Sequence, residues 1–209
     1  MSEFGGLYPE LQIDQNTIVA IDAMYVVNTI VLKSTWMESG DDLALEFLNR
    51  IDAVCKDAKT IAIAFDTYQE TLLKNPTRVG WNEKEKRKKT ARKFQINSSI
   101  NIKKVTMSEI LGTVATKNSL TWFLTEKSIT HFEEWGITFA IAGNGSSYFS
   151  FQNSIPNNHE EADTMIINFL CILQPVEKDV VVHSVDTDVF TLLLRHFTEG
   201  FFVKLCLWY

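Results

Sequence analysis

The chain has 209 residues, of which 45% are hydrophobic and 22% are charged, and its formal net charge is −6. This length suits one domain with a substantial core, and the composition is that of an ordinary soluble globular protein. No apolar stretch reaches the roughly 18 residues of a membrane-spanning helix, and the first residues have no signal-peptide pattern. We therefore expect no membrane association and an intracellular location, either nuclear or cytoplasmic.

The cysteines give no indication of a metal site. Cys55, Cys171 and Cys206 lie within apolar patterns and lack the spacing of metal ligands. They are therefore expected to be buried, reduced thiols of an intracellular protein.

Short apolar runs rich in Val and Ile alternate with helical patterns in the first part of the chain. After a leader over residues 1–16, a first strand is expected to run through about Val27. An amphipathic helix with acids at its start follows, with apolar positions at helical spacing over residues 43–55. A buried strand over residues 60–65 then completes a βαβ unit, whose crossover is expected to be right-handed.

The rest of the chain begins with an interruption of this alternation. Residues 67–105 have no convincing apolar period and are interpreted as a flexible arch or loop with a helix around 82–94. The remaining pattern predicts helices at 108–111, 119–129, 160–173 and 189–196, and strands at 138–142, 148–151, 180–186 and 201–208. The predicted fold class is α/β, a mainly parallel central sheet flanked by helices, over residues 17–209.

Three of the short apolar runs end in an aspartate, and a fourth acidic cluster begins the helix before the last of these runs. These acids are Asp22, Asp66, the group Glu160, Glu161 and Asp163, and the pair Asp186 and Asp188. Function in open α/β sheets collects at the carboxyl ends of the strands, so these carboxylates are expected to converge there. Crowded carboxylates repel one another unless a divalent cation lies among them, which predicts a metal-dependent enzyme. The structural alternative is that they form turns, cap helices or complement helix dipoles.

A basic segment contrasts with the acidic remainder of the chain. Residues 74–104 hold eleven Lys or Arg and two acids, a local charge of +9, whereas the remainder carries −15. A solvated helix face is the common explanation of a charge run, but this density favours a nucleic-acid partner, DNA or RNA. The Lys-Arg-Lys-Lys core also fits a nuclear import signal. The predicted nucleic-acid-binding residues are Lys74, Arg78, Lys84, Lys86, Arg87, Lys88, Lys89, Arg92 and Lys93.

The order of these motifs resembles the flap endonuclease and PIN-like nuclease superfamily. In that family a strand ends in Asp, a second strand ends in Phe-Asp, a Glu-Ala-Glu or Glu-Ala-Asp motif follows, and an Asp-x-Asp follows a later strand. Here the matching motifs are Asp22, Phe65-Asp66, Glu161-Ala162-Asp163 and Asp186-Thr187-Asp188. The basic segment stands where flap endonucleases have a basic arch. The sequences of the individual motifs resemble still more closely those of uncharacterised animal PIN-like proteins associated with mobile elements.

This resemblance implies a structure-specific nuclease that cleaves phosphodiester bonds with two Mg²⁺ or Mn²⁺ ions. The ions would lie roughly 4 Å apart, one activating water and the other stabilising the leaving oxygen. The implied catalytic residues are also the metal ligands, with Glu160 as an additional ligand: Asp22, Asp66 and Glu161 for one ion, and Asp163, Asp186 and Asp188 for the other. Flap endonucleases carry a further Asp and a helical DNA-binding element, neither of which occurs before Tyr209. If the chain is a fragment, its site lacks a ligand.

Two alternatives stay open at this point. A catalytically inactive PIN-like module would act as a scaffold for nucleic acid or protein, with the apolar carboxyl terminus as a possible protein-binding segment. A haloacid-type phosphatase also has Asp-x-Asp after a strand, but it carries the pair after its first strand, where this chain has Asp22-Ala23-Met24. His183 lies inside a predicted strand and is interpreted as a core or sheet residue rather than as a general base.

Overall fold

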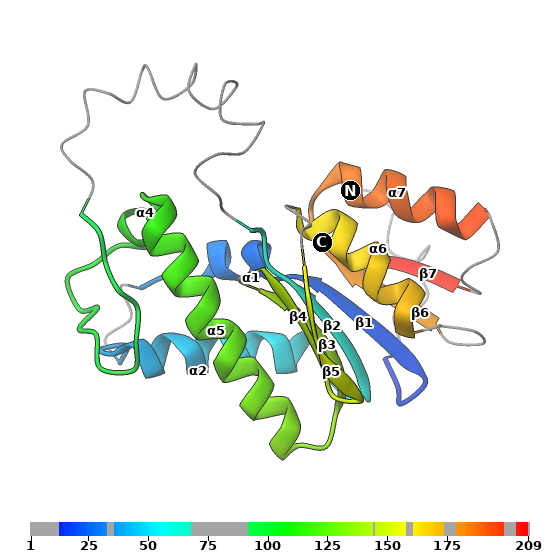
Figure 1. The fold of residues 1–209 in the computed structure, drawn as a ribbon, viewed down its shortest axis with the longest axis horizontal. Helices are drawn as coiled ribbons and strands as arrows, with labels where there is room; N and C mark the ends of the chain where they lie inside the picture. Colours follow the sequence, from blue (N-terminus) through cyan, green and yellow to red (C-terminus); the bar gives the residue numbers. More distant parts are fainter. Residues whose placement is uncertain are drawn as a thin grey trace, which may run out of the picture.

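The computed structural model describes residues 13–32, 36–67, 92–143, 145–157, 161–173, 179–198 and 204–208. A seven-stranded sheet with the order β5-β4-β3-β2-β1-β6-β7 forms the middle of the fold (Figure 1). Its strands are β1 (Thr17–Asp22), β2 (Thr60–Ala64), β3 (Thr138–Gly143), β4 (Ser146–Phe149), β5 (Gln152–Pro156), β6 (Asp179–His183) and β7 (Lys204–Trp208). Strands β3, β2, β1, β6 and β7 run parallel, and β4 and β5 extend the sheet as antiparallel strands.

Helices cover both faces of this sheet. They are α1 (Ala23–Thr29), α2 (Gly40–Cys55), α4 (Met107–Ile110), α5 (Val114–Glu134), α6 (Ala162–Leu173) and α7 (Thr187–Thr198). Helices α1, α2, α4 and α5 pack on one face, and α6 and α7 pack on the other (Figure 1). The chain is therefore an α/β protein with a mostly parallel sheet between two helical layers.

The alternation of side chains along each strand produces two hydrophobic clusters. In β1, Val19 and Ile21 belong to the cluster under α2 and α5, whereas Ile18 and Ala20 belong to the cluster under α6. The α6 face of β2 and β3 is made of alanines, which leaves room for the large side chains of α6, among them the fully buried Phe169. Because both of their faces are covered, the central parallel strands β1, β2 and β3 are mainly apolar, as the sequence indicates.

Local hydrogen bonds fix the ends of the helices. Ser39 caps α2 by accepting from the N–H of Asp42 at 3.2 Å, and the Asp42 carboxylate accepts from the N–H of Ser39 at 2.8 Å. This capping box satisfies donors that the first helical turn leaves without partners. At the end of α5, Gly136 adopts φ +63, and the next N–H bonds back to the carbonyl of Phe132 at 3.1 Å. This is a Schellman motif, in which glycine tolerates the left-handed conformation.

Several predicted elements are confirmed, and some boundaries are wrong: the strand predicted over 180–186 ends at His183, and the one predicted over 148–151 covers Ser146–Phe149. The helices expected around 43–55, 119–129, 160–173 and 189–196 are present, and the strand expected at 201–208 is β7, paired with β6. The first strand does not continue to Val27, because Asp22 accepts hydrogen bonds from two following N–H groups and starts α1. Strand β5 was not predicted, since all its residues are exposed and its sequence lacks an apolar period.

The predictions for the leader, for residues 67–105 and for the cysteines are only partly covered by the described residues. Most of the predicted 82–94 helix and the leader residues 1–12 lie outside the described residues, and residues 92–94 are not helical. Residues 92–105 are not a loose loop, because Ile96 and Ile102 are buried in the core at 5% and 0% exposure. Cys55 is buried as predicted, but Cys171 is exposed, which corrects the prediction for that thiol, and nothing is described of the side chain of Cys206.

The described residues also bear on membrane association and on surface shape. Among them, no helix combines the length and the apolar character that spanning a membrane requires.

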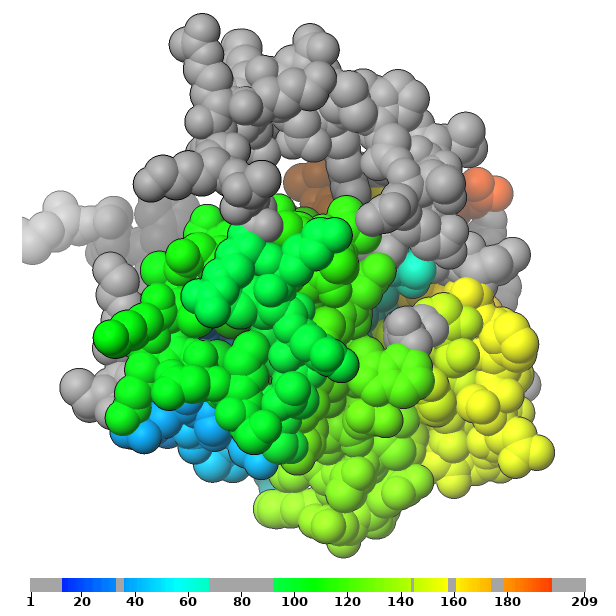
Figure 2. Space-filling view, turned by 60° about the vertical axis from the view of Figure 1, so that its left-hand side comes forward, coloured from blue at the N-terminus to red at the C-terminus, as the bar shows by residue number. Residues whose placement is uncertain are grey.

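Figure 2 shows one face of the molecule, where residues 92–134 form most of the surface above α2 and beside the β4–β5 hairpin. The carboxyl terminus was proposed to bind a protein through apolar side chains, and those side chains lie outside the described set.

Close packing of α5 on β3 predicts a defined effect of one substitution. A Cβ added at Gly143 would lie 2.0 Å from Oγ1 of Thr125, a buried hydroxyl without a hydrogen-bond partner in the described structure. We expect Gly143→Ala to lower the free energy of unfolding by about 2 kcal/mol through overpacking, as measured by urea denaturation. Thr125→Ala removes the Oγ1 that causes the closest clash and leaves its Cβ at 3.1 Å, so the double variant should recover most of the loss. Additive losses in the double variant would contradict this account.

Candidate metal centre at the carboxyl edge of the sheet

Three adjacent parallel strands, β2, β1 and β6, end at the same edge of the sheet. In the register Asp22 pairs with Ala64, and Ile21 pairs with His183, so the residues that follow these strands leave the sheet together. Strand order reverses at β1, because β2 and β3 continue on one side of it and β6 and β7 on the other. Such a reversal opens a crevice at the carboxyl ends of the strands, where ligands of open α/β sheets bind.

Asp22 lies at the centre of this edge. It is the last residue of β1 and caps α1, since its Oδ1 accepts hydrogen bonds from the N–H groups of Met24 at 3.0 Å and Tyr25 at 3.1 Å. Its second carboxylate oxygen, Oδ2, accepts a hydrogen bond from Oγ of Ser184 at 3.4 Å. Asp22 is therefore fixed by its own helix and by the segment after β6.

Asp66 joins the end of β2 to the start of α6. Its Oδ1 accepts a hydrogen bond from the N–H of Ala162 at 3.1 Å, although the two residues are 96 positions apart in the chain. Ala162 is buried, and its neighbours Glu161 and Asp163 are both partly buried. This contact places the backbone of the Glu-Ala-Asp motif beside the aspartate that follows β2.

The segment after β6 has a different character. Ser184 is 2% exposed and accepts a hydrogen bond from the N–H of Asp186 at 3.1 Å. The Asp186 carboxylate accepts from the N–H of Asp188 at 2.8 Å, and both aspartates are exposed. Asp186 therefore performs the structural role of organising the start of α7, and it reaches the other acids through Ser184 rather than through direct contact among the described residues.

Ser184 is the site residue that the sequence analysis missed. A serine after a strand carries no specific signal of its own. The sequence shows that Ser184 lies two residues before Asp186. Its hydrogen bond to Asp22, however, depends on the pairing of β1 with β6 in the folded sheet. The same adjacency places the ring of His183 5.0 Å from that of Tyr25, so His183 is a partly buried sheet residue, as predicted.

The carboxyl of Asp22 has a perturbed protonation equilibrium. Burial, with a smaller contribution from the negative charge of Asp66, raises its pKa from the ordinary value of 3.8 to about 6, although the backbone hydrogen bonds oppose the rise. Desolvation and a like charge both disfavour the ionised form. A bound divalent cation would remove this penalty by placing positive charge between the two carboxylates.

The described residues fit a divalent cation in chemistry but do not form a complete cluster. Carboxylate and hydroxyl oxygens are the ligands that Mg²⁺ and Mn²⁺ prefer. In the part of the chain that the structure describes, no three His, Cys, Asp or Glu side chains are grouped so that they would hold a metal ion. Asp22 and Asp66 form the electrostatically coupled pair, and Glu160 lies outside the described residues.

Most of the predicted nucleic-acid-binding residues also lie outside the described set. Lys74, Arg78, Lys84, Lys86, Arg87, Lys88 and Lys89 belong to residues 68–91. Arg92 and Lys93 are described and exposed.

Comparison with models of protein families, with curated protein sequences and with solved structures finds no match to this chain.

The raised pKa of Asp22 predicts how stability depends on pH. Between about pH 4 and 6 the folded protein holds a proton that the unfolded chain has lost, so stability falls as pH rises through this window. We expect Asp22→Asn, which keeps the helix cap, to raise the free energy of unfolding by on the order of 2 kcal/mol at pH 7.5 in EDTA. At pH 4 the difference should nearly vanish. Urea denaturation at both pH values measures it.

Asp57→Asn is the matched control, because Asp57 is exposed and its substitution changes the net charge equally. It should leave stability within about 0.5 kcal/mol at either pH. Excess Mg²⁺ should reduce the advantage of Asp22→Asn, since only the wild-type site gains by binding the ion. A variant that is less stable than wild type at pH 7.5 in EDTA would contradict the proposed carboxylate repulsion.

Proposed function

We propose that this protein is a metal-dependent nuclease that hydrolyses phosphodiester bonds of DNA or RNA at the carboxyl edge of its sheet. One observation carries the proposal: contacts link the ends of β1, β2 and β6 and the start of α6 at one place. Asp22 contacts Ser184 after β6 and is electrostatically coupled to Asp66, which in turn bonds the backbone between Glu161 and Asp163. The resemblance to PIN-like nucleases rests on these motifs.

Each acid has a distinct role in this proposal. Asp22 and Asp66 provide the fixed, partly buried oxygens that hold a divalent cation, and their helix-capping bonds keep the carboxylates in place. Glu161 and Asp163 supply further oxygens from the start of α6, with Glu160 as an additional candidate. Asp186 and Asp188 are exposed, so they approach the ion only if the segment after Ser184 rearranges. A bound Mg²⁺ or Mn²⁺ would supply a nucleophilic hydroxide and stabilise the leaving oxygen.

The basic segment supports a nucleic-acid substrate. Residues 74–104 follow Asp66 along the chain and carry a charge of +9, whereas the remainder carries −15. Phosphate contacts of Lys and Arg provide affinity that falls with salt and carry no sequence information. Such a segment would hold the substrate backbone against the repulsion of an acidic metal-free site.

One observation favours a second candidate, a nucleic-acid-binding scaffold without catalysis. The Asp186 carboxylate is occupied by the N–H of Asp188, and the described residues lack a group of three metal ligands. In that case the acids at this edge would be retained as helix caps. The two candidates differ in whether the purified chain cleaves nucleic acid when Mg²⁺ is added.

The proposed function predicts the effect of removing one charge from the coupled pair. Asp66→Asn keeps the oxygen that accepts from Ala162 but halves the charge of the pair, so it should lower cleavage by at least about a hundredfold while leaving substrate binding intact. Asp186→Asn should also lower cleavage, and Asp57→Asn should not. The assay is Mg²⁺-dependent cleavage of flap, single-stranded and RNA substrates by wild type and variants in parallel.

Two outcomes would redirect the interpretation. Equal activity of wild type and Asp66→Asn would place the chemistry elsewhere in the molecule. If the wild-type chain neither cleaves any substrate nor binds Mn²⁺ but still binds nucleic acid, the scaffold is the correct description.

A further inference from the structure

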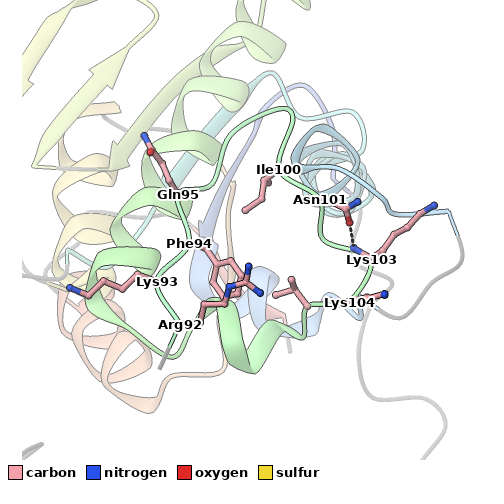
Figure 3. A pocket seen from close by; sticks show the side chains of 9 residues that line it. Arg92, Lys93, Phe94, Gln95, Ile100, Asn101, Lys103 and Lys104 are labelled. Carbon is pink, nitrogen blue, oxygen red and sulfur yellow. Dashed lines mark hydrogen bonds between the residues drawn. The ribbon is translucent and has the colours of Figure 1, made fainter. Parts of the chain in front are cut away.

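An open groove lies on the face formed by the segment that connects β2 to α5. Its volume is about 580 Å³, within the range of ligand-binding clefts. Two stretches of this segment line it: Arg92, Lys93, Phe94 and Gln95 from one, and Ile100, Asn101, Lys103, Lys104 and Val105 from the other. Figure 3 shows the guanidinium of Arg92 in the middle of the groove, with Lys93 extending to one side and Lys103 and Lys104 to the other.

The groove has a well-anchored framework. The N–H of Phe94 donates to Oγ1 of Thr116 at 3.0 Å, and the N–H of Ile96 donates to Oγ of Ser119 at 2.7 Å, so one stretch is fastened to α5. The other stretch is held at the start of α2, where the N–H of Ile102 donates to the carbonyl of Glu38 at 3.0 Å. The groove is therefore preformed, which lowers the entropic cost of binding a ligand.

The hydrophobic floor supports the central cation. Phe94, Ile100 and Val105 are partly buried against the main core. The guanidinium carbon of Arg92 lies 5.1 Å from the ring centroid of Phe94, a cation–π contact that holds the charge above the floor. An aromatic ring beside a cation is the combination with which proteins bind single-stranded nucleic acid.

The charges around the groove are predominantly positive. Residues 92–104 contain four cations and no acid. Among the described residues, two acids interact with these cations: Glu38 pairs with Lys103 at 2.6 Å, and Glu109 interacts electrostatically with Arg92. The Lys103 pair is half exposed and therefore weak. Within the described residues no ion pair involves Lys93 or Lys104, so their charges remain available to an anionic ligand.

We propose that this groove binds the phosphate backbone of single-stranded nucleic acid. The cations flank the groove on two sides, and a single strand laid along it presents phosphates to both, whereas each backbone of a duplex faces its partner strand on one side. This inference rests on the proposed function for the class of ligand and adds Lys103 and Lys104 to the predicted contact residues. It concerns binding and needs neither the metal nor the acidic edge.

The test is binding of a fluorescent oligonucleotide of about 15 nucleotides to the full chain in EDTA, across a series of salt concentrations. The variant is Arg92→Gln with Lys104→Gln, both at exposed positions. We expect roughly tenfold weaker binding in ~100 mM salt and a salt dependence less steep by about 1.4, the contribution of two phosphate contacts on a single strand. Charge-conserving Arg92→Lys with Lys104→Arg should retain the affinity within about threefold.

A control variant separates the groove from net charge. Lys56→Gln with Lys59→Gln removes two charges at the turn between α2 and β2. It should bind like wild type. Equal losses in both variants, or no loss in either, would overturn the groove assignment. Tighter binding of a duplex than of the single strand, or binding of heparin without binding of the oligonucleotide, would overturn the choice of ligand.

Failure of this inference is distinguishable from failure of the proposed function. Groove-dependent binding without Mg²⁺-dependent cleavage would leave the groove in place and remove the nuclease. Cleavage that is lost in Asp66→Asn but unaffected by the groove variant at low substrate concentration would support the nuclease and remove the groove.

Discussion

The proposed metal centre depends on two acidic side chains, Asp22 and Asp66, that lie where the parallel strands β1 and β2 end. Burial and, to a smaller extent, the negative charge of Asp66 disfavour the ionised form of Asp22. The fold accepts the cost because both carboxylates cap helices, Asp22 at α1 and Asp66 at α6. A helix cap stabilises by about 1 kcal/mol, which offsets part of this cost, and a bound cation would offset more of it.

The sheet determines which residues meet at this edge. The parallel register of β2, β1 and β6 brings their carboxyl ends together, and the alternating side chains bury one set under α5 and the other under α6. Alanines beneath α6 let that helix lie close to the sheet, so the N–H of Ala162 reaches Asp66. Core packing on one face thus sets the geometry of the acidic edge.

Much of this was predictable, and what was not depends on long-range contacts. Apolar runs and helical spacing identified the buried strands and the helices that pack on them, and the position of Asp22 and Asp66 after strands predicted their proximity. The sequence did not reveal that Asp66 caps α6 or that Ser184 contacts Asp22, because these bonds join residues 96 and 162 positions apart. Lys103 and Lys104 were not assigned a role, since their groove forms only when α2 and α5 anchor the segment. Asp186 is a different case: its position in the Asp-x-Asp motif was recognised from the sequence, but in the structure it is exposed and its carboxylate accepts from the N–H of Asp188 at the start of α7.

The central claim is that Asp22 and Asp66 together bind a divalent cation. The most direct measurement is titration of the full chain with Mn²⁺, followed by electron paramagnetic resonance of the free ion, without any substrate. The account predicts saturable binding in wild type and in Asp57→Asn, and affinity at least about tenfold weaker in a variant that carries Asp22→Asn and Asp66→Asn, which preserves both helix caps. Equal Mn²⁺ affinity in the wild-type chain and the double variant would contradict it.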